Sequence, residues 1–158
     1  MKTMILAGFA LAGLAVAAPA LAADAQVEAP IHQFVDAFDK GDMKTAGAAF
    51  LPSVTIIDEV PPHYWTGPTA FAAWGADLGK DAKAGGLSDM SVTLGKVTDE
   101  IVSGSDAYVV IEATFAYKQK SGAMREPAHM NYALKKTAAG WKIAGWAWSG
   151  TPPVAAKK

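Results

Sequence analysis

Asp58 carries the most specific chemical signal in the sequence. It directly follows the apolar, mainly β-branched run Val54 to Ile57, and Val60 comes soon after it. Apolar surroundings disfavour the ionised form of a carboxylate, so they raise its pKa towards the range in which a general base works at neutral pH. The pattern therefore indicates either a catalytic base or an aspartate that caps the turn after a strand.

Two other side chains could assist a base at this position. His63 follows Asp58 in the same loop, beside Tyr64 and Trp65, and its imidazole could transfer a proton or hold a ligand. Tyr132 offers a hydroxyl donor from a predicted strand, where a tyrosine can also serve packing alone. The predicted catalytic set is Asp58, Tyr132 and His63.

Composition argues against several other classes of site. The 158 residues include no cysteine, which excludes disulfides, thiolate catalysis and thiolate zinc sites. The three histidines lack the spacing of metal ligands, so we expect neither a metal site nor a cofactor. With 14 Lys and Arg against 15 Asp and Glu, no basic stripe is present to support nucleic-acid binding.

Helical periodicity dominates the first half of the chain. Apolar residues recur every three or four positions over Val27–Asp39, and Asp42 can cap a second helix over Met43–Phe50. A third helix is expected after Thr66-Gly67-Pro68, with Trp74 on its buried side. Between them, residues 54–58 are predicted as a strand and 59–65 as a loop.

The apolar period changes from 3.6 to 2 after Ser88, which predicts a run of antiparallel strands. The four strand candidates are Met90–Thr98, Ala107–Lys118, Ala128–Lys136 and Trp141–Ser149. Helices followed by consecutive strands indicate an α+β domain over residues 23–150, and residues 151–158 are expected to form a disordered tail.

Three local segments resemble one known family. The first is Phe34–Asp42, the second Trp65–Phe71 and the third Trp141–Ser149. In this order they resemble the nuclear transport factor 2-like (NTF2-like) superfamily, including SnoaL-like and ketosteroid isomerase-like domains. The resemblance implies a cystatin-like cone, in which three N-terminal helices pack on a curved antiparallel sheet around a pocket for a small molecule. It also implies a homodimer formed through the outer face of the sheet.

The resemblance also bears on catalysis. In sequence order Asp58 matches the base of ketosteroid isomerases, but Phe34 stands where their tyrosine donor would lie. The last-strand histidines of SnoaL-like domains match Gly145 and Ala147, which carry no catalytic group. Steroid isomerisation is therefore not expected.

Strand alternation divides the last two strands into two faces. A turn over residues 137–140 places Lys136 opposite Trp141. In regular strands one face then carries Met130 and Tyr132 together with Gly145 and Ala147, and this face is expected to line the pocket. The residues predicted to bind the ligand are Phe34, Trp65, Trp74, Met130, Gly145 and Ala147.

The opposite face carries His129, Trp146 and Trp148. Two exposed tryptophans form an apolar patch, so this face is predicted to be the homodimer interface. A register slip of one residue would exchange the faces and place His129, Asn131 and Trp146 in the pocket instead.

Residues 1–22 read as a secretory signal peptide. A positive Lys2 precedes the apolar stretch Met4–Ala18, and Ala20-Leu21-Ala22 is a small-x-small cleavage site. We expect a periplasmic or secreted bacterial protein with no membrane attachment after cleavage.

Three functions fit these observations. The first is a module that binds a small, mainly apolar molecule. The second is a cofactor-free isomerase, lyase or hydratase that uses Asp58 as a base. The third is an association domain without catalysis.

Overall fold

The computed structural model of the protein describes residues 24–156. The predicted signal peptide lies outside the described residues. The elements in chain order are α1 (Ala25–Asp39), α2 (Met43–Gly47), β1 (Phe50–Ile57), β2 (Tyr64–Gly67), α3 (Ala70–Gly85), β3 (Ser88–Ser103), β4 (Asp106–Gln119), β5 (Gly122–Thr137), β6 (Gly140–Gly150) and β7 (Val154–Ala155).

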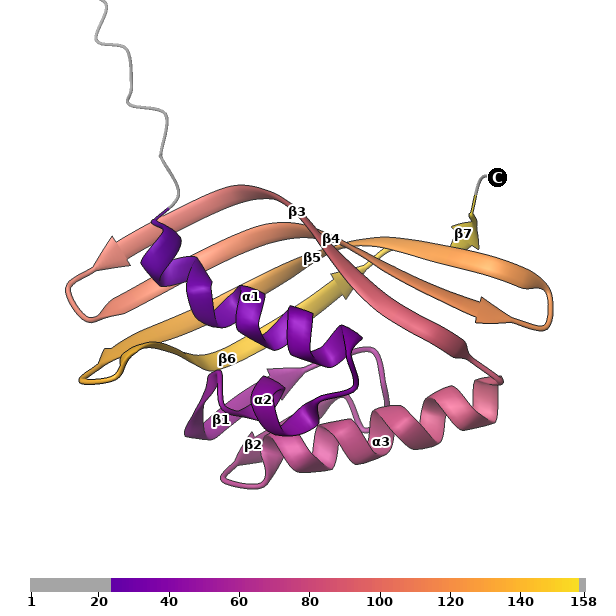
Figure 1. Ribbon diagram of the computed structural model, residues 1–158, viewed down its shortest axis with the longest axis horizontal. Coiled ribbons are helices and arrows are strands. Elements are labelled where there is room, and N and C mark those ends of the chain that lie inside the picture. The colour runs from indigo at the N-terminus through magenta and orange to yellow at the C-terminus, as the bar shows by residue number, and fades with distance from the viewer. Residues whose placement is uncertain (1–23, 157–158) are drawn as a thin grey trace, which may run out of the picture.

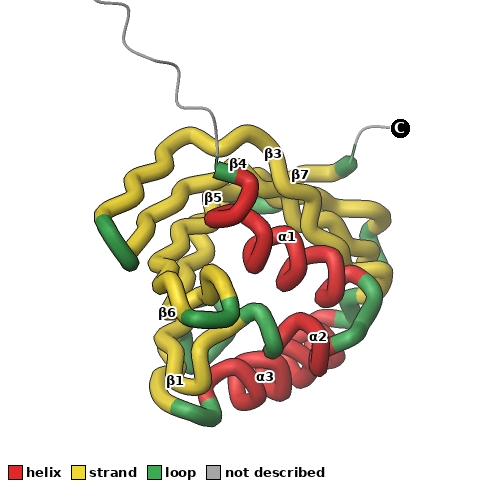
Figure 2. The backbone as a smooth tube through the Cα atoms, turned by 60° about the vertical axis from the view of Figure 1, so that its left-hand side comes forward, coloured by secondary structure: helices red, strands yellow, loops and turns green. Residues whose placement is uncertain are grey.

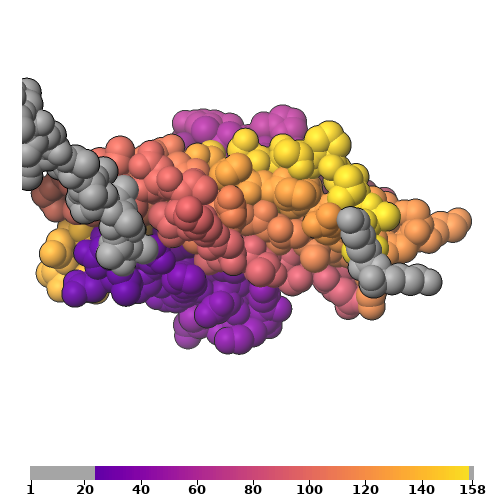
Figure 3. Space-filling view, turned by 90° about the horizontal axis from the view of Figure 1, so that it is seen from above, coloured from indigo at the N-terminus to yellow at the C-terminus, as the bar shows by residue number. Residues whose placement is uncertain are grey.

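The strands form one curved sheet, and the helices lie on its concave side. The strand order is β2-β1-β6-β5-β4-β3, with β7 pairing with β5 outside this path. Strand β1 runs parallel to β6, whereas the other pairs are antiparallel. Figures 1 and 2 show α1 crossing the hollow of the sheet, and Figure 3 shows the β4–β5 turn projecting at one end. The predicted α+β cone is confirmed.

Helix α1 provides much of the core. Asp24 caps its N-terminus by accepting a hydrogen bond from the backbone N–H of Gln26. Its apolar stripe is completely or almost completely buried, including Val27, Ile31 and Phe34. The sequence predicts this helix to within two residues, because its helical periodicity and its packing against the sheet agree.

The second helix is shorter than predicted. It ends at Gly47, and β1 begins at Phe50, which the sequence places in the helix. The backbone N–H of Ile143 in β6 donates to the carbonyl oxygen of Ala49 at 3.0 Å. This hydrogen bond joins residues 49–50 to the sheet instead of to the helix. Tertiary strand pairing therefore outweighs local helix propensity here.

Two segments predicted to be irregular form short strands. The end of the predicted loop 59–65 belongs to β2, where Tyr64 pairs with Ile57. The predicted disordered tail contains β7, in which Val154 pairs with Arg125. Both strands are short, with four residues in β2 and two in β7, which gives them little periodic signal.

The register between β5 and β6 is predicted correctly only at its start. Lys136 pairs with Trp141, as the turn length predicts. The register then shifts, because Ala133 pairs with Gly145 and leaves Ala144 as an extra residue. A β-bulge of this kind moves the following side chains to the other face.

The bulge turns Trp146 and Trp148 inward. They lie opposite Tyr132 and Met130 on the concave face, so their assignment to an outer dimer interface is wrong. His129 is exposed and stays on the outer face. The alternative of a one-residue slip is confirmed for Trp146, which lines the cavity, but it is wrong for His129 and Asn131, because only the part of β6 beyond the bulge is reversed.

Candidate functional site

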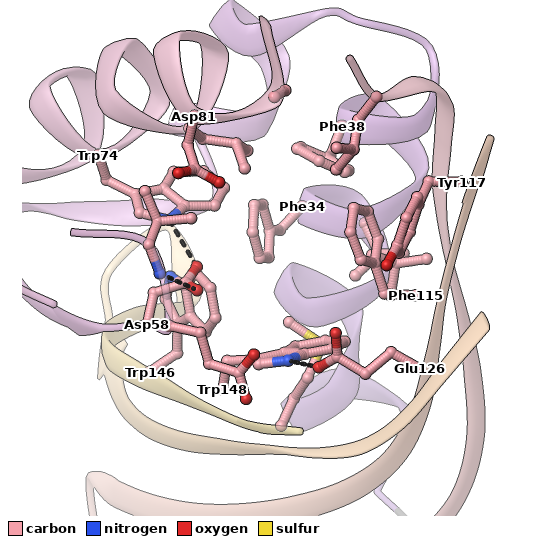
Figure 4. A pocket seen from close by; sticks show the side chains of 18 of the residues that line it. Phe34, Phe38, Asp58, Trp74, Asp81, Phe115, Tyr117, Glu126, Trp146 and Trp148 are labelled. Atoms are coloured by element: carbon pink, nitrogen blue, oxygen red, sulfur yellow. Dashed lines mark hydrogen bonds between the residues drawn. The ribbon is translucent and has the colours of Figure 1, made fainter. Parts of the chain in front are cut away.

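A cavity of about 350 Å³ lies between α1, α3 and the concave face of the sheet. Most of its wall is apolar, and seven of the lining side chains carry large aromatic rings. These side chains are Phe34, Phe38, Trp74, Phe115, Tyr117, Trp146 and Trp148. Figure 4 shows that some of these rings come from the helices and the others from the sheet.

Phe34 contacts several other aromatic rings on the helical side of the cavity. Its ring centroid lies 5.6 Å from that of Trp146, 6.0 Å from that of Trp74 and 5.0 Å from that of Phe50. Edge-to-face and tilted contacts at these distances are favourable and fix ring orientation. The cavity rings form two contacting groups: Phe34, Phe38, Trp74 and Trp146 from α1, α3 and β6, and Phe115, Tyr117 and Trp148 from β4 and β6.

Asp58 lies in this wall, at the end of β1. The indole N–H of Trp74 donates to its Oδ2 at 2.7 Å, and the backbone N–H of Val60 donates to Oδ1 at 3.3 Å (Figure 4). Burial raises the pKa of Asp58, and these hydrogen bonds only partly oppose the shift. The carboxyl group is thus held in one orientation and is easier to protonate than an exposed aspartate.

Glu126 provides a second cavity carboxyl, which is not among the residues predicted from the sequence. Only 6% of this residue is exposed, and Trp148 donates its indole N–H to Oε1 at 2.7 Å. Burial raises the pKa of Glu126, and the negative charges of Glu59 and Asp58 raise it further. The predicted strand begins at Ala128, six residues after the start of β5 at Gly122, so it omits Glu126 although Glu126 has the same parity as Ala128 and Met130.

Two exposed carboxyls complete the charged part of the cavity. Glu59 and Asp81 both line it, and both are solvent-exposed. Glu59 and Glu126 approach each other over Gly150, where an added Cβ would lie 2.7 Å from Glu59 Oε1 and closer still to Glu126 Oε1. Glycine at position 150 therefore leaves room for the two carboxyl groups.

The arrangement has counterparts in known proteins. A family model described as NTF2-like protein (DUF6841) matches residues 24–151, which is most of the chain. The chain belongs to this NTF2-like family. No curated protein matches it.

Solved structures show the same fold as this NTF2-like chain. A ketosteroid isomerase-like protein from Erwinia carotovora atroseptica is 20% identical, with a TM-score of 0.62 over 82% of this chain and 96% of that one. An NTF2-like protein with a cystatin-like fold from Novosphingobium aromaticivorans is 16% identical, with a TM-score of 0.64 over 80% of each chain. The CaMKII hub from S. rosetta is 20% identical, with a TM-score of 0.63 over 80% of this chain and 95% of that one. At these identities the likeness concerns the fold.

Four of the predicted site residues of the NTF2-like domain lie in the cavity wall. They are Asp58, Phe34, Trp74 and Met130. Their roles in catalysis or binding stay predictions, but the structure brings them to one space from α1, α3, β5 and the end of β1.

The two predicted assistants of Asp58 lie outside this wall. Tyr132 is fully buried, and its hydroxyl donates to the sulfur of Met130 at 3.4 Å, so it serves packing. His63 is exposed, and its Nδ1 lies 3.2 Å from the backbone carbonyl oxygen of Asp58. Neither side chain reaches the cavity to assist the carboxyl group.

Three predicted ligand contacts are also absent from the wall. The indole of Trp65 points to α3 and donates to Asp77 at 3.0 Å. Gly145 and Ala147 lie on the outer face because of the bulge in β6. Gly145 does not leave space for a ligand, since a Cβ there would lie 2.8 Å from the carbonyl oxygen of Thr55.

The carboxyl cluster does not have the geometry of a metal site. Across residues 24–156, no group of three histidine, aspartate or glutamate side chains is arranged to hold a metal ion.

In the same part of the chain, no helix has the length and apolarity to cross a bilayer.

Proposed function

We propose that this NTF2-like domain binds a small, mainly apolar molecule in its cone-shaped cavity. The carrying observation is the mainly aromatic wall around a space of about 350 Å³, in which Phe34 contacts both Trp74 and Trp146. Concave, mainly aromatic pockets with a few placed polar groups are the usual form of small-molecule sites. Asp58 and Glu126 supply those polar groups.

The tryptophans allow a site-specific binding test. Trp74, Trp146 and Trp148 line the cavity, whereas Trp65 and Trp141 do not. In a ¹H–¹⁵N NMR titration with the neutral probe 3-phenylpropanol, the first three indole signals are expected to shift and saturate together. The other two serve as internal controls. Equal small shifts of all five signals, or none, would reject binding in the cavity.

A second candidate function is proton transfer with Asp58 as the general base. The specific observation in its favour is that a carboxyl group with a raised pKa lies in the wall and is oriented by Trp74. Its carboxylate would remove a proton from a carbon next to a carbonyl group and return it at the same or a neighbouring carbon. The ketosteroid isomerase-like neighbour makes this reaction class reasonable for the fold, which hosts many activities.

Carbon–hydrogen exchange tests the second candidate. We expect the protein to speed deuterium uptake by 4-phenyl-2-butanone in D₂O. Asp58→Asn should abolish this acceleration while binding of 3-phenylpropanol survives. Asp77→Asn is the matched control. Asp77 accepts a hydrogen bond from the indole of Trp65, just as Asp58 accepts one from the indole of Trp74, but Asp77 lies outside the cavity. Exchange that persists in Asp58→Asn would exclude Asp58 as the base.

The outer sheet face supports a third proposal, homodimerisation. Large apolar side chains remain exposed there, with Ile101 at 55% and Tyr108 at 43% exposure. These two residues pair across β3 and β4 and lie in the same row as Ala133 and Gly145. Exposed apolar patches of this kind mark association sites, and the neighbouring CaMKII hub shows that the fold occurs in assemblies.

A further inference from the structure

The charge of the cavity is of one sign. Asp58, Glu59, Asp81 and Glu126 line it, and none of the described residues in its wall is lysine, arginine or histidine. The carboxyl groups of Asp58, Asp81 and Glu126 surround the space into which the rings of Phe34 and Phe115 project (Figure 4). An anionic ligand would therefore meet repulsion on several sides.

The carboxyl groups of Asp58 and Glu126 have no cationic partner among the described residues. None of the ion pairs found between residues 24 and 156 includes Asp58 or Glu126. Each accepts one indole hydrogen bond, which orients it but leaves its charge uncompensated. Burying a carboxylate without a counter-charge costs free energy. A cation that enters the cavity supplies the missing counter-charge and is therefore bound favourably.

The aromatic rings favour the same kind of ligand. The faces of tryptophan, tyrosine and phenylalanine attract cations through the ring quadrupole, most strongly in sites shielded from water. Trp148 and Tyr117 line the cavity together with Glu126. The carboxyl group and the aromatic rings in this part of the wall therefore both favour a cationic ligand.

We propose that the cavity recognises an organic cation, an amine or quaternary ammonium compound with an apolar body. Its cationic head would lie between the carboxyl groups of Asp58 and Glu126, and its apolar body against Phe34 and Trp146. This inference rests on the proposed function, because it names the chemical class of the molecule that the cavity holds.

Three probes with one hydrocarbon frame separate charge from apolar burial. They are 3-phenylpropylammonium, 3-phenylpropanol and 3-phenylpropanoate, titrated at neutral pH with the indole signals of Trp74, Trp146 and Trp148 as readout. We expect the ammonium probe to bind at least about tenfold more tightly than the alcohol, and the carboxylate most weakly. Equal or tighter binding of the alcohol would overturn the cation preference and leave the proposed function standing. Failure of all three probes would overturn both.

Charge-neutral variants provide the second arm of the test. Asp58→Asn and Glu126→Gln should each reduce the ratio of ammonium to alcohol affinity by several-fold while the alcohol still binds. Glu112→Gln removes an exposed carboxylate from the outer face and should leave the ratio unchanged. An unchanged ratio in both cavity variants would overturn the assignment of the cationic head to this pair.

Discussion

Two carboxyl–indole pairs define the candidate site at the scale of single residues. Asp58 is predictable because an apolar run leads directly to it, and its local sequence already indicates burial. Glu126 lacks such a signal, since Arg125 and Pro127 flank it and suggest a turn or strand end. Its burial depends on the position of Trp148, which lies 22 residues later and turns inward only because of the bulge. Local sequence thus locates the first carboxyl group but not the second.

The ionisation of Glu126 should limit the stability of the folded protein at high pH. Burial raises its folded-state pKa, so its contribution to stability is complete below the unfolded-state pKa and is lost as pH rises through the folded-state pKa. Glu126→Gln removes this ionisation and can still accept the Trp148 hydrogen bond. We expect its melting temperature to exceed that of the wild type by a few degrees above neutral pH, with the difference vanishing in acid.

Asp77→Asn is the control of opposite sign. Hydrogen bonds from Lys80 and Trp65 lower the pKa of Asp77, so its carboxylate stabilises the fold above the unfolded-state pKa and loses this effect as pH falls. Its variant should show no gain in melting temperature at neutral or higher pH. A Glu126→Gln protein less stable than the wild type there would contradict the assignment of an unfavourable buried charge.

At the scale of elements, the bulge in β6 decides which side chains reach the cavity. Period-2 alternation predicts the strand and its first pairing correctly, but parity fails beyond Ala144. The physical reason is that β6 pairs with β5 on one side and with the parallel β1 on the other. A bulge increases local twist and lets one strand satisfy both neighbours. Alternation within β6 alone contains no information about that second neighbour.

Gly145 tests this explanation of the β1–β6 contact. A Cβ at this position would lie 2.8 Å from the backbone carbonyl oxygen of Thr55, and backbone atoms cannot move aside cheaply. We expect Gly145→Ala to lower the free energy of unfolding by about 1–3 kcal/mol, because the added methyl group forces the backbones of β1 and β6 to shift. Urea denaturation followed by far-UV circular dichroism would measure the change.

Gly79→Ala is the matched control for the same substitution. Gly79 lies inside α3, where an added Cβ meets nothing within 4 Å. Alanine should stabilise that helix by about 0.5–1 kcal/mol relative to glycine. Equal effects at positions 79 and 145 would contradict the close approach of β6 to the Thr55 carbonyl.

At the scale of the whole molecule, the order of elements determines more than local detail does. Helices followed by long antiparallel strands are enough to predict an α+β domain, and the resemblance to the NTF2-like superfamily adds the helix layer on a curved sheet. The structure confirms both. Cavity volume depends on sheet curvature and on side chains from distant elements, so it does not follow from the sequence pattern. The outer face carries His129, as predicted, but its exposed apolar side chains are Ile101 and Tyr108 instead of Trp146 and Trp148.

The exposed apolar residues on the outer face of the sheet lead to a specific prediction about dimer formation. Ile101 and Tyr108 face each other across β3 and β4, so Ile101→Lys with Tyr108→Glu replaces an apolar pair by an opposite-charge pair that the sheet tolerates. We expect the wild type to sediment as a dimer at micromolar concentration and the double variant as a monomer, with the cavity indole signals unchanged. Val154→Lys is the control, because it removes an exposed apolar side chain from β7, apart from this row, and should leave the dimer intact. A monomeric wild type, or a double variant that remains dimeric, would exclude this pair as part of the interface.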